Sequence, residues 1–409
     1  MSSGRLQIGT FATDIGRPAS NARVRVSPRG ARNQILVELI TDSSGQTPVI
    51  DLAAPPLEFS MSGEYKPYSE YDIQIVMDGY QPQIIEGVQI LPATTAYQDI
   101  RLRPVPGYNS QVTLISIQEH TLWGTFPPKT PEDEVKELPP PTGYIVLPDP
   151  VIPEFIIVHD GPPNNASAPN YWIPFADYIK NVASCEIYSN WPRATITANV
   201  LAILSFTLNR VYTEWYRGKG YNFTITSSTA YDHAFSYGRN IFSEISSVVD
   251  DIFTSFITRP GIRQPLLAQY CDGKNVACPN WMTQWGSKAL GDQGYSAIDI
   301  LKSFYGYDIY LMQARKVDGV PSSYPGTALQ MGTVGEYVRV IQEQLNAVSD
   351  HYPAIPKLRV DGIFGEQTRI AVGTFQDIFR LSSDGIVGFN TWYKLSYIYV
   401  SVTRMAELN

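Results

Sequence analysis

The sequence has few of the residues that metal centres and disulfide networks need. Its 409 residues include three cysteines and four histidines. It contains no C-x-x-C pair and no H-E-x-x-H or similar zinc spacing, so we expect no metal and no cofactor. Cys271 and Cys278 flank a glycine-containing loop and are either a local disulfide, two thiols or, with a histidine, a metal site. Cys185 is expected to be a small buried residue.

Long basic runs and long apolar runs are also missing. The formal net charge is −8 and lysine and arginine form no extended cluster, which argues against a nucleic-acid partner. No segment reaches the ~20 consecutive apolar residues that cross a bilayer, so we expect no membrane partner. The first residues, MSSGRLQIGTFATD, lack a charged region followed by an apolar core, so we expect no secretory signal peptide.

The composition is otherwise that of a globular protein with room for two to four domains, since 44% of the residues are hydrophobic. In residues 1–105, apolar residues alternate in short stretches such as Val24 and Val26 or Ile73 and Ile75, bounded by turn residues. Short strands at this spacing indicate an all-β sandwich. No catalytic group stands out there, so we interpret it as a structural, targeting or inhibitory domain.

Residues 106–152 are rich in proline and contain an acidic patch at Glu132, Asp133 and Glu134. Such a composition resists helix and sheet and favours extended geometry. We interpret this segment as a linker, which is either a semi-rigid spacer or a site of proteolytic processing.

A long buried helix is predicted to begin near Pro192, because residues 198–208 are apolar on nearly every face. Glu186 stands six residues before this proline. We expect it where the buried helix meets the surface, with aromatic residues beside it. Partial desolvation there favours the protonated carboxyl that a general acid needs. The alternative is a solvated or ion-paired residue near a helix end. The surrounding mixed α+β domain is expected over 153–315.

Two motifs in this domain resemble sporulation stage II protein D and its relatives, which are lytic transglycosylases that cut peptidoglycan. The first is E-x-x-x-x-W-P from Glu186, and the second is T-Q-W-G-S at 283–287, followed by F-Y-G at 304–306. The resemblance implies that Glu186 is the catalytic acid. The sequence departs from the family at 187–188, where Ile-Tyr replaces the usual Met-Pro, and it lacks the family's histidine upstream of the second motif.

In such a reaction one carboxyl protonates the glycosidic oxygen and then takes the proton of the C6 hydroxyl, which leaves a 1,6-anhydro end. A hydrolase needs a second carboxylate, for which Asp232 is the candidate. Otherwise Asp232 caps a turn or positions the substrate. The residues expected to bind the glycan are Trp191, Tyr231, Asp232, Tyr270, Gln284 and Trp285.

The C-terminal part, 327–409, contains an internal repeat. D-G-I-F-G at 361–365 recurs as D-G-I-V-G at 384–388, and each copy precedes a helical pattern. With a third helix ahead of them, a three-helix unit is predicted. Over about 70 residues it resembles the peptidoglycan-binding domain of wall hydrolases. The two loops are either helix-start turns, a ligand surface or both, through the residues Asp361, Gly362, Gly365, Asp384, Gly385 and Gly388.

The N-terminal part resembles the transthyretin-like regulatory domain found beside some carboxypeptidases, through G-R-P-A at 16–19, T-D-S-S-G at 41–45 and D-I-R-L at 99–102. Together the four parts resemble clostridial-type spore cortex-lytic enzymes. This implies a zymogen that is located in the cortex or coat region of the spore and is activated by a protease that cuts the linker. The activated enzyme would then degrade cortex peptidoglycan during germination. A non-catalytic wall-binding protein is the alternative from another class.

Overall fold

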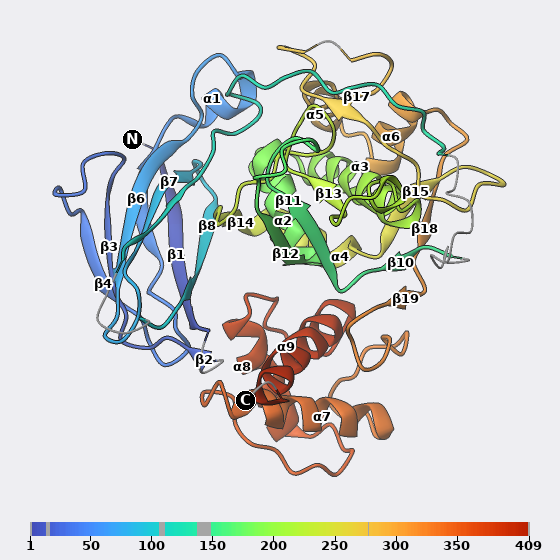
Figure 1. The fold of residues 1–409 in the computed structure, drawn as a ribbon. Helices are drawn as coiled ribbons and strands as arrows, with labels where there is room; N and C mark the ends of the chain where they lie inside the picture. The colour runs from blue at the N-terminus through green and yellow to red at the C-terminus, as the bar shows by residue number, and fades with distance from the viewer. Residues whose placement is uncertain (1, 14–16, 106–110, 137–148, 277, 408–409) are drawn as a thin grey trace.

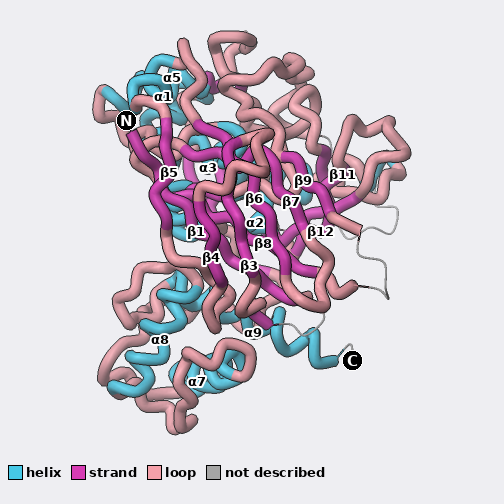
Figure 2. Tube along the Cα trace, turned by 90° about the vertical axis from the view of Figure 1, so that its left-hand side faces the viewer, coloured by secondary structure: helices cyan, strands magenta, loops and turns pink. Residues whose placement is uncertain are grey.

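The computed structural model describes residues 2–13, 17–105, 111–136, 149–276 and 278–407. The chain is a multidomain protein of mixed α and β structure with a helical C-terminal region (Figure 1). The strand-rich N-terminal part lies beside a central mixed domain, and the C-terminal helices lie below both (Figures 1 and 2).

Two five-stranded sheets carry the N-terminal part, and inward-facing residues of both, such as Leu6, Ile8, Val24 and Ile73, are fully buried. One sheet contains β1 (Ser2–Ala12), β2 (Arg17–Pro18), β5 (Ile50–Ala54), β8 (Thr95–Leu102) and β14 (Ile241–Phe242). The other contains β3 (Arg23–Pro28), β4 (Val37–Ile40), β6 (Ser69–Val76), β7 (Gln83–Ile90) and β9 (Thr113–Ser116). A short helix, α1 (Leu57–Ser62), follows β5.

The central domain is built around α3 (Arg193–Tyr212), which begins directly after Pro192 as predicted. Its helices and strands are α2 (Phe175–Glu186), η1 (Arg217–Lys219), α4 (Ser243–Ile252), α5 (Gln284–Asp292), α6 (Ala297–Tyr305), β10 (Val151–Ile152), β11 (Phe155–His159), β12 (Asn170–Pro174), β13 (Ile225–Thr226), β15 (Ser255–Thr258), β16 (Tyr270–Cys271), β17 (Met282–Thr283), β18 (Tyr310–Gln313) and β19 (Lys316–Val317). Among the described helices, α3 has the length and hydropathy of a membrane span, but 83% of its apolar window is buried inside the protein. It therefore serves as the core helix of this domain.

The central domain and the N-terminal part share one hydrophobic core. Strand β14 of the central domain pairs with β8, and the amide of Asn240 exchanges two hydrogen bonds of 3.0 Å with the main chain of Gln89. The proline-rich segment also joins these parts, because β9 pairs with β7. This corrects the expectation that the segment resists sheet structure: residues 111–116 contain no proline and are rich in β-branched side chains.

The C-terminal region has a core of its own, as the predicted three-helix unit requires. It consists of α7 (Glu336–Ser349), α8 (Glu366–Ile378) and α9 (Phe389–Glu407). It contacts the N-terminal part through Arg380, which forms an ion pair with Asp99 at 2.9 Å, and the central domain through Asn390, which donates to Asp251 at 2.5 Å. Aromatic rings also meet across this boundary, because the ring centre of Phe253 in the central domain lies 5.5 Å from that of Phe389 and 5.3 Å from that of Tyr393 on α9.

Candidate active site

Glu186 is the last residue of α2, and only 4% of it is exposed. The expectation of a half-exposed carboxyl at the surface is therefore wrong for this structure. The cause is a long segment from the predicted linker, residues 117–136, which lies over the end of α2. We call this segment the strap. In Figure 1 it is the teal trace that crosses from the N-terminal sheets over the central domain.

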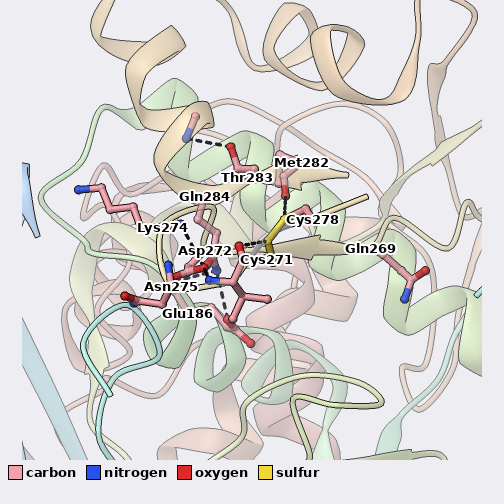
Figure 3. Close-up of a disulfide and its surroundings, with 12 residues drawn as sticks. Glu186, Gln269, Cys271, Asp272, Lys274, Asn275, Cys278, Met282, Thr283 and Gln284 are labelled. Atoms are coloured by element: carbon pink, nitrogen blue, oxygen red, sulfur yellow. Dashed lines mark hydrogen bonds between the residues drawn. A yellow bond between two sulfur atoms is a disulfide. The ribbon is translucent and has the colours of Figure 1, made fainter. Parts of the chain in front are cut away.

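Three donors from distant parts of the chain hold the Glu186 carboxylate. The main-chain N–H of Ala234 donates to Oε1 at 2.9 Å. The hydroxyl of Thr121 and the amide of Gln284 each donate to Oε2 at 3.1 Å. Gln284 also donates to the main-chain oxygen of Glu186 at 2.9 Å, so it fixes both ends of that residue (Figure 3). The carboxylate is thus oriented by hydrogen bonds on both oxygens.

The strap also brings a cation to this place. The Lys129 ammonium donates to the main-chain oxygen of Asp232 at 2.5 Å and lies 4.4 Å from the ring centre of Tyr270 and 4.8 Å from that of Phe206. Burial lowers the pKa of Lys129 to about 8, although the nearby carboxylates of Glu186 and Asp232 oppose that shift. The lysine therefore lies where a positive charge is attracted by the glutamate but is poorly solvated.

Further contacts anchor the strap to the central domain. The N–H of Thr130 donates to the main chain of Ala230 at 2.7 Å. Glu132 receives two hydrogen bonds, of 2.6 and 3.0 Å, from the guanidinium of Arg210 on α3. Further along the strap, Glu134 forms an ion pair of 2.9 Å with Arg259. The main-chain N–H of Lys136 donates a hydrogen bond of 3.0 Å to the side-chain oxygen of Gln264.

Asp232, the second candidate carboxylate, is fully buried in the same region. Arg210 donates to its Oδ1 at 2.7 Å. The hydroxyls of Tyr216 and Thr226 donate to its Oδ2 at 2.7 and 2.6 Å, and the N–H of Thr226 does so at 2.9 Å. Both oxygens are engaged by these groups, which makes Asp232 part of the framework that ties α3 to the strand β13.

The aromatic residues expected to bind the glycan are mostly covered. Trp191 is 3% exposed and lies with its ring centre 5.0 Å from that of Trp285. Helix α1 of the N-terminal part sits on this pair: the indole N–H of Trp191 donates to the main chain of Ser60 at 2.9 Å, and a side chain at Gly63 would meet the Trp285 ring at 2.5 Å. Tyr231 is 37% exposed, and Trp285 is partly buried.

Tyr270 is 3% exposed and points into the interior rather than along a surface. Its hydroxyl is 2.7 Å from Nδ1 of His233, a residue that the sequence did not single out. Burial raises the pKa of Tyr270 well above its usual value, and the charge of Glu186 adds to that effect. Burial also lowers the pKa of His233 well below its usual value, so its ring is neutral. Thr121, Lys129 and His233 were missed because no local motif marks them.

Cys271 and Cys278 form a disulfide (Figure 3). This decides between the possibilities left open by their spacing. The bond closes the loop between β16, which carries Tyr270, and β17, which leads into Gln284 at the start of α5. It therefore braces two residues beside Glu186. Cys185 is a buried free thiol, as expected.

The two D-G-x-x-G loops of the C-terminal region are each braced by one buried glutamine. Gln342 donates to Asp361 at 3.1 Å and accepts from the N–H of Gly362 at 2.9 Å. In the second copy, Gln376 makes the equivalent bonds, both of 2.8 Å, to Asp384 and Gly385. Both second-position glycines have positive φ, of 75° and 70°. The N–H groups of Gly362 and Gly385 are thus engaged within the protein, whereas Gly365 and Gly388 have open space around them.

Comparison with known proteins gives one family match. Residues 334–395 match the family described as "Putative peptidoglycan binding domain". No curated protein matches the chain.

Among solved structures, the chain is similar to the SleB N-terminal domain, with 33% identity over 18% of this chain and 93% of that one, at a TM-score of 0.16. It is also similar to the Bacillus anthracis TIE protein, with 16% identity over 25% of this chain and 17% of that one (TM-score 0.18). A third similar structure is Klebsiella pneumoniae 5-hydroxyisourate hydrolase, with 15% identity over 25% of this chain and 91% of that one (TM-score 0.17).

Proposed function

We propose that this chain, whose residues 334–395 match a peptidoglycan-binding family, is a lytic transglycosylase that degrades spore cortex peptidoglycan. The proposal includes a location in the cortex or coat region of the spore, as in the SleC type of clostridial enzyme that the sequence resembles. The observation that carries it is the setting of Glu186, a carboxylate oriented by Ala234 and Gln284 beside Trp191 and Trp285, on a motif that resembles the catalytic one.

In the proposed reaction Glu186 acts twice. It first protonates the oxygen of the bond between N-acetylmuramic acid and N-acetylglucosamine, and the bond from C1 to that oxygen breaks. It then accepts the proton of the C6 hydroxyl while that oxygen forms a new bond to C1, so one carboxyl serves as acid and then as base. The engagement of both Asp232 oxygens supports this single-carboxylate scheme over a hydrolase that uses Asp232 as its second group.

We further propose that the intact chain is a latent form. The strap and α1 cover Glu186 and the tryptophan pair, so a glycan strand has no access while they are in place. After a cut between 136 and 151, within the predicted linker, both covering elements are covalently connected to the N-terminal part alone. They can then leave the central domain together. Most of that stretch lies outside the described residues.

The C-terminal domain is proposed to hold the enzyme on its polymer. Around its first loop, four apolar side chains are at least half exposed: Met331 (50%), Val334 (70%), Tyr337 (50%) and Ile363 (51%). Val334 and Ile363 are joined by a β-bridge, which makes the surface continuous there. Sugar rings present apolar faces that stack on such side chains.

Product analysis tests the proposal. The chain is cut with a protease in the linker, incubated with cortex peptidoglycan, and the released fragments are weighed by mass spectrometry. We expect 1,6-anhydro ends, and we expect Glu186→Gln to reduce their release by at least ~1,000-fold, since the acid is lost. The control Glu244→Gln changes an exposed glutamate on α4 and should be active. Reducing ends would indicate a hydrolase, and no release by any variant would leave a wall-binding protein.

A further inference from the structure

The strap places a carboxylate against a guanidinium that is completely enclosed. The side chain of Arg210, on α3, is 0% exposed, and its two terminal nitrogens donate to the two carboxylate oxygens of Glu132 at 2.6 and 3.0 Å. Arginine recognises planar carboxylates through this bidentate geometry. In the intact chain, therefore, a strap carboxylate occupies a place that is shaped for that chemical group.

Groups of the central domain hold Arg210 in this orientation. Its Nε donates to Asp232 at 2.7 Å, and its Nη2 also donates to the main-chain oxygen of Tyr231 at 3.0 Å. Its guanidinium carbon lies 5.1 Å from the ring centre of Trp215. These three partners are not part of the strap, so the guanidinium keeps its orientation when the strap leaves.

Departure of the strap takes the acceptor away from two of these guanidinium donors. Asp232 does not replace it, because both of its oxygens are already engaged by other groups. Charged donors without a partner are unfavourable in a largely buried place, so the vacated position favours another anion. The ammonium of Lys219, 3.3 Å from the centre of the Trp215 ring, adds a second positive charge there.

The path of the strap connects this position with the candidate active site. Three strap residues in succession contact Glu186, the main chain of Asp232 and Arg210. Tyr231, whose main chain accepts from Arg210, is 37% exposed, so the path reaches the surface there. A polymer that replaces the strap over Glu186 can therefore follow the same path to the guanidinium.

We propose that Arg210 binds a carboxylate of the peptidoglycan once the strap has left, an inference that rests on the proposed function. N-acetylmuramic acid carries a lactyl carboxylate where no peptide is attached, and an attached peptide carries a carboxylate at its end. Both groups match the two donors of the guanidinium. In the latent chain, Glu132 thus occupies the place of a substrate carboxylate.

A second arginine under the strap serves as the matched control. Arg259 forms an ion pair of 2.9 Å with the strap residue Glu134, and its Nη2 also donates to the main-chain oxygen of Tyr305 at 2.7 Å. Its side chain is 22% exposed, and its Nη1 pairs with the exposed Asp308. When the strap leaves, Arg259 therefore keeps a carboxylate on a terminal nitrogen, which Arg210 does not.

The test compares soluble glycan strands that differ only in charge. One set is stripped of peptides by an amidase, which frees the lactyl carboxylates, and the other keeps its peptides. Part of each set is coupled to methylamine, which converts carboxylates into neutral amides. For the linker-cut chain, KM should be at least ~tenfold lower for a charged strand than for its amide, with little change in kcat. The set that shows the difference identifies the source of the carboxylate.

Two variants show whether Arg210 causes this preference. Arg210→Lys should abolish it, because an ammonium keeps the charge beside Asp232 but lacks the two parallel donors. Arg259→Lys should retain it, and circular dichroism checks that both variants are folded. Equal KM values of the wild-type chain for charged and neutral strands would overturn the inference without any variant. A folded Arg210→Lys chain that retains the preference would overturn it as well.

A binding measurement separates this inference from the proposed function. Charged strands compete with Glu132 for Arg210. They should therefore displace the N-terminal fragment from the linker-cut Glu186→Gln chain at a concentration at least ~tenfold lower than their amides, as followed by gel filtration. Adding Arg210→Lys should remove this difference, which excludes the C-terminal domain as its cause. Selective displacement without cleavage by the wild-type chain refutes the proposed function alone, and cleavage without any preference refutes the inference alone.

Discussion

Two regions of the molecule hold carboxylates by hydrogen bonds, and the partners of these carboxylates lie at very different distances along the chain. In the C-terminal loops, Asp361 and Asp384 receive hydrogen bonds from glutamines 19 and 8 residues away. The Glu186 carboxylate instead receives its hydrogen bonds from residues 48, 65 and 98 positions away. The loops are self-contained, whereas the glutamate depends on three separate segments.

The difference matters because one of those three segments can leave. Gln342 and Gln376 belong to the same small core as the loops they brace, so the loops keep their shape whatever happens elsewhere. Thr121 belongs to the strap, which after a cut in the linker is covalently connected to the N-terminal part alone. A site made from distant segments is thus open to control by proteolysis, and a site made from a local repeat is not.

The largest effect is expected from weakening the strap in the uncut chain. Thr121→Val with Lys129→Met removes a hydrogen bond to Glu186 and a cation between two aromatic rings. Each contact contributes about 1 kcal/mol, so the open fraction and the rate of fragment release should rise on the order of thirtyfold. The control is Lys66→Met, which changes a partly exposed lysine of the N-terminal part that is paired with Glu70. Hydrogen exchange of the main-chain amides in the strap shows whether the strap has loosened. If exchange is faster in the uncut double variant but fragment release is not, the strap does not cause latency.

A smaller effect, confined to one region, is expected from the loop glutamines. Gln342→Leu leaves the N–H of Gly362 without its acceptor and should lower the unfolding free energy of the C-terminal domain by about 2–3 kcal/mol. Gln376→Leu should cost the same, and the exposed Gln367→Leu almost nothing. Denaturation of the full chain, followed by circular dichroism, measures all three. Cleavage of soluble glycan fragments by the cut chain should be unchanged, and a loss there would show that the two regions are coupled.

The most gradual effect is a pH dependence of strap docking, because it is spread over the interval between pH 8 and 10.5. The pKa of Lys129 is about 8 in the docked strap, against an ordinary value of 10.5. Below pH 8 both states carry the proton, so docking does not vary with pH through this group. Between pH 8 and 10.5 the docked strap has lost a proton that the released strap keeps, and docking therefore strengthens as pH rises. Urea titrations followed by the fluorescence of Trp123, which is in the strap, should show this strengthening in the wild type and not in Lys129→Met.

Much of the fold was predictable from local patterns. Pro192 and the apolar stretch after it gave the correct start of α3, because proline is tolerated only at the beginning of a helix. The repeat gave the C-terminal helices, and the alternation around Val24 and Ile73 gave the strands. The proline-rich segment was predicted less well, since its composition describes what the backbone avoids and not which surface it lies on.

The candidate site was predictable only in part. Glu186, Trp191 and Gln284 carry a recognisable motif and do come together. Thr121, Lys129 and His233 have no such mark, and their positions beside the glutamate follow from packing.

By itself the sequence determined the start of α3, the alternation of the N-terminal strands and the C-terminal repeat with its helices, since hydrogen bonds within a helix or a short loop join residues that are close in the chain. Only the tertiary structure decided that Glu186 is buried, that Asp232 is held by Arg210, and that Tyr270 lies against His233 in the interior. Burial and ion pairing depend on which distant segments meet, and the free energy of those contacts is set by the whole packed protein.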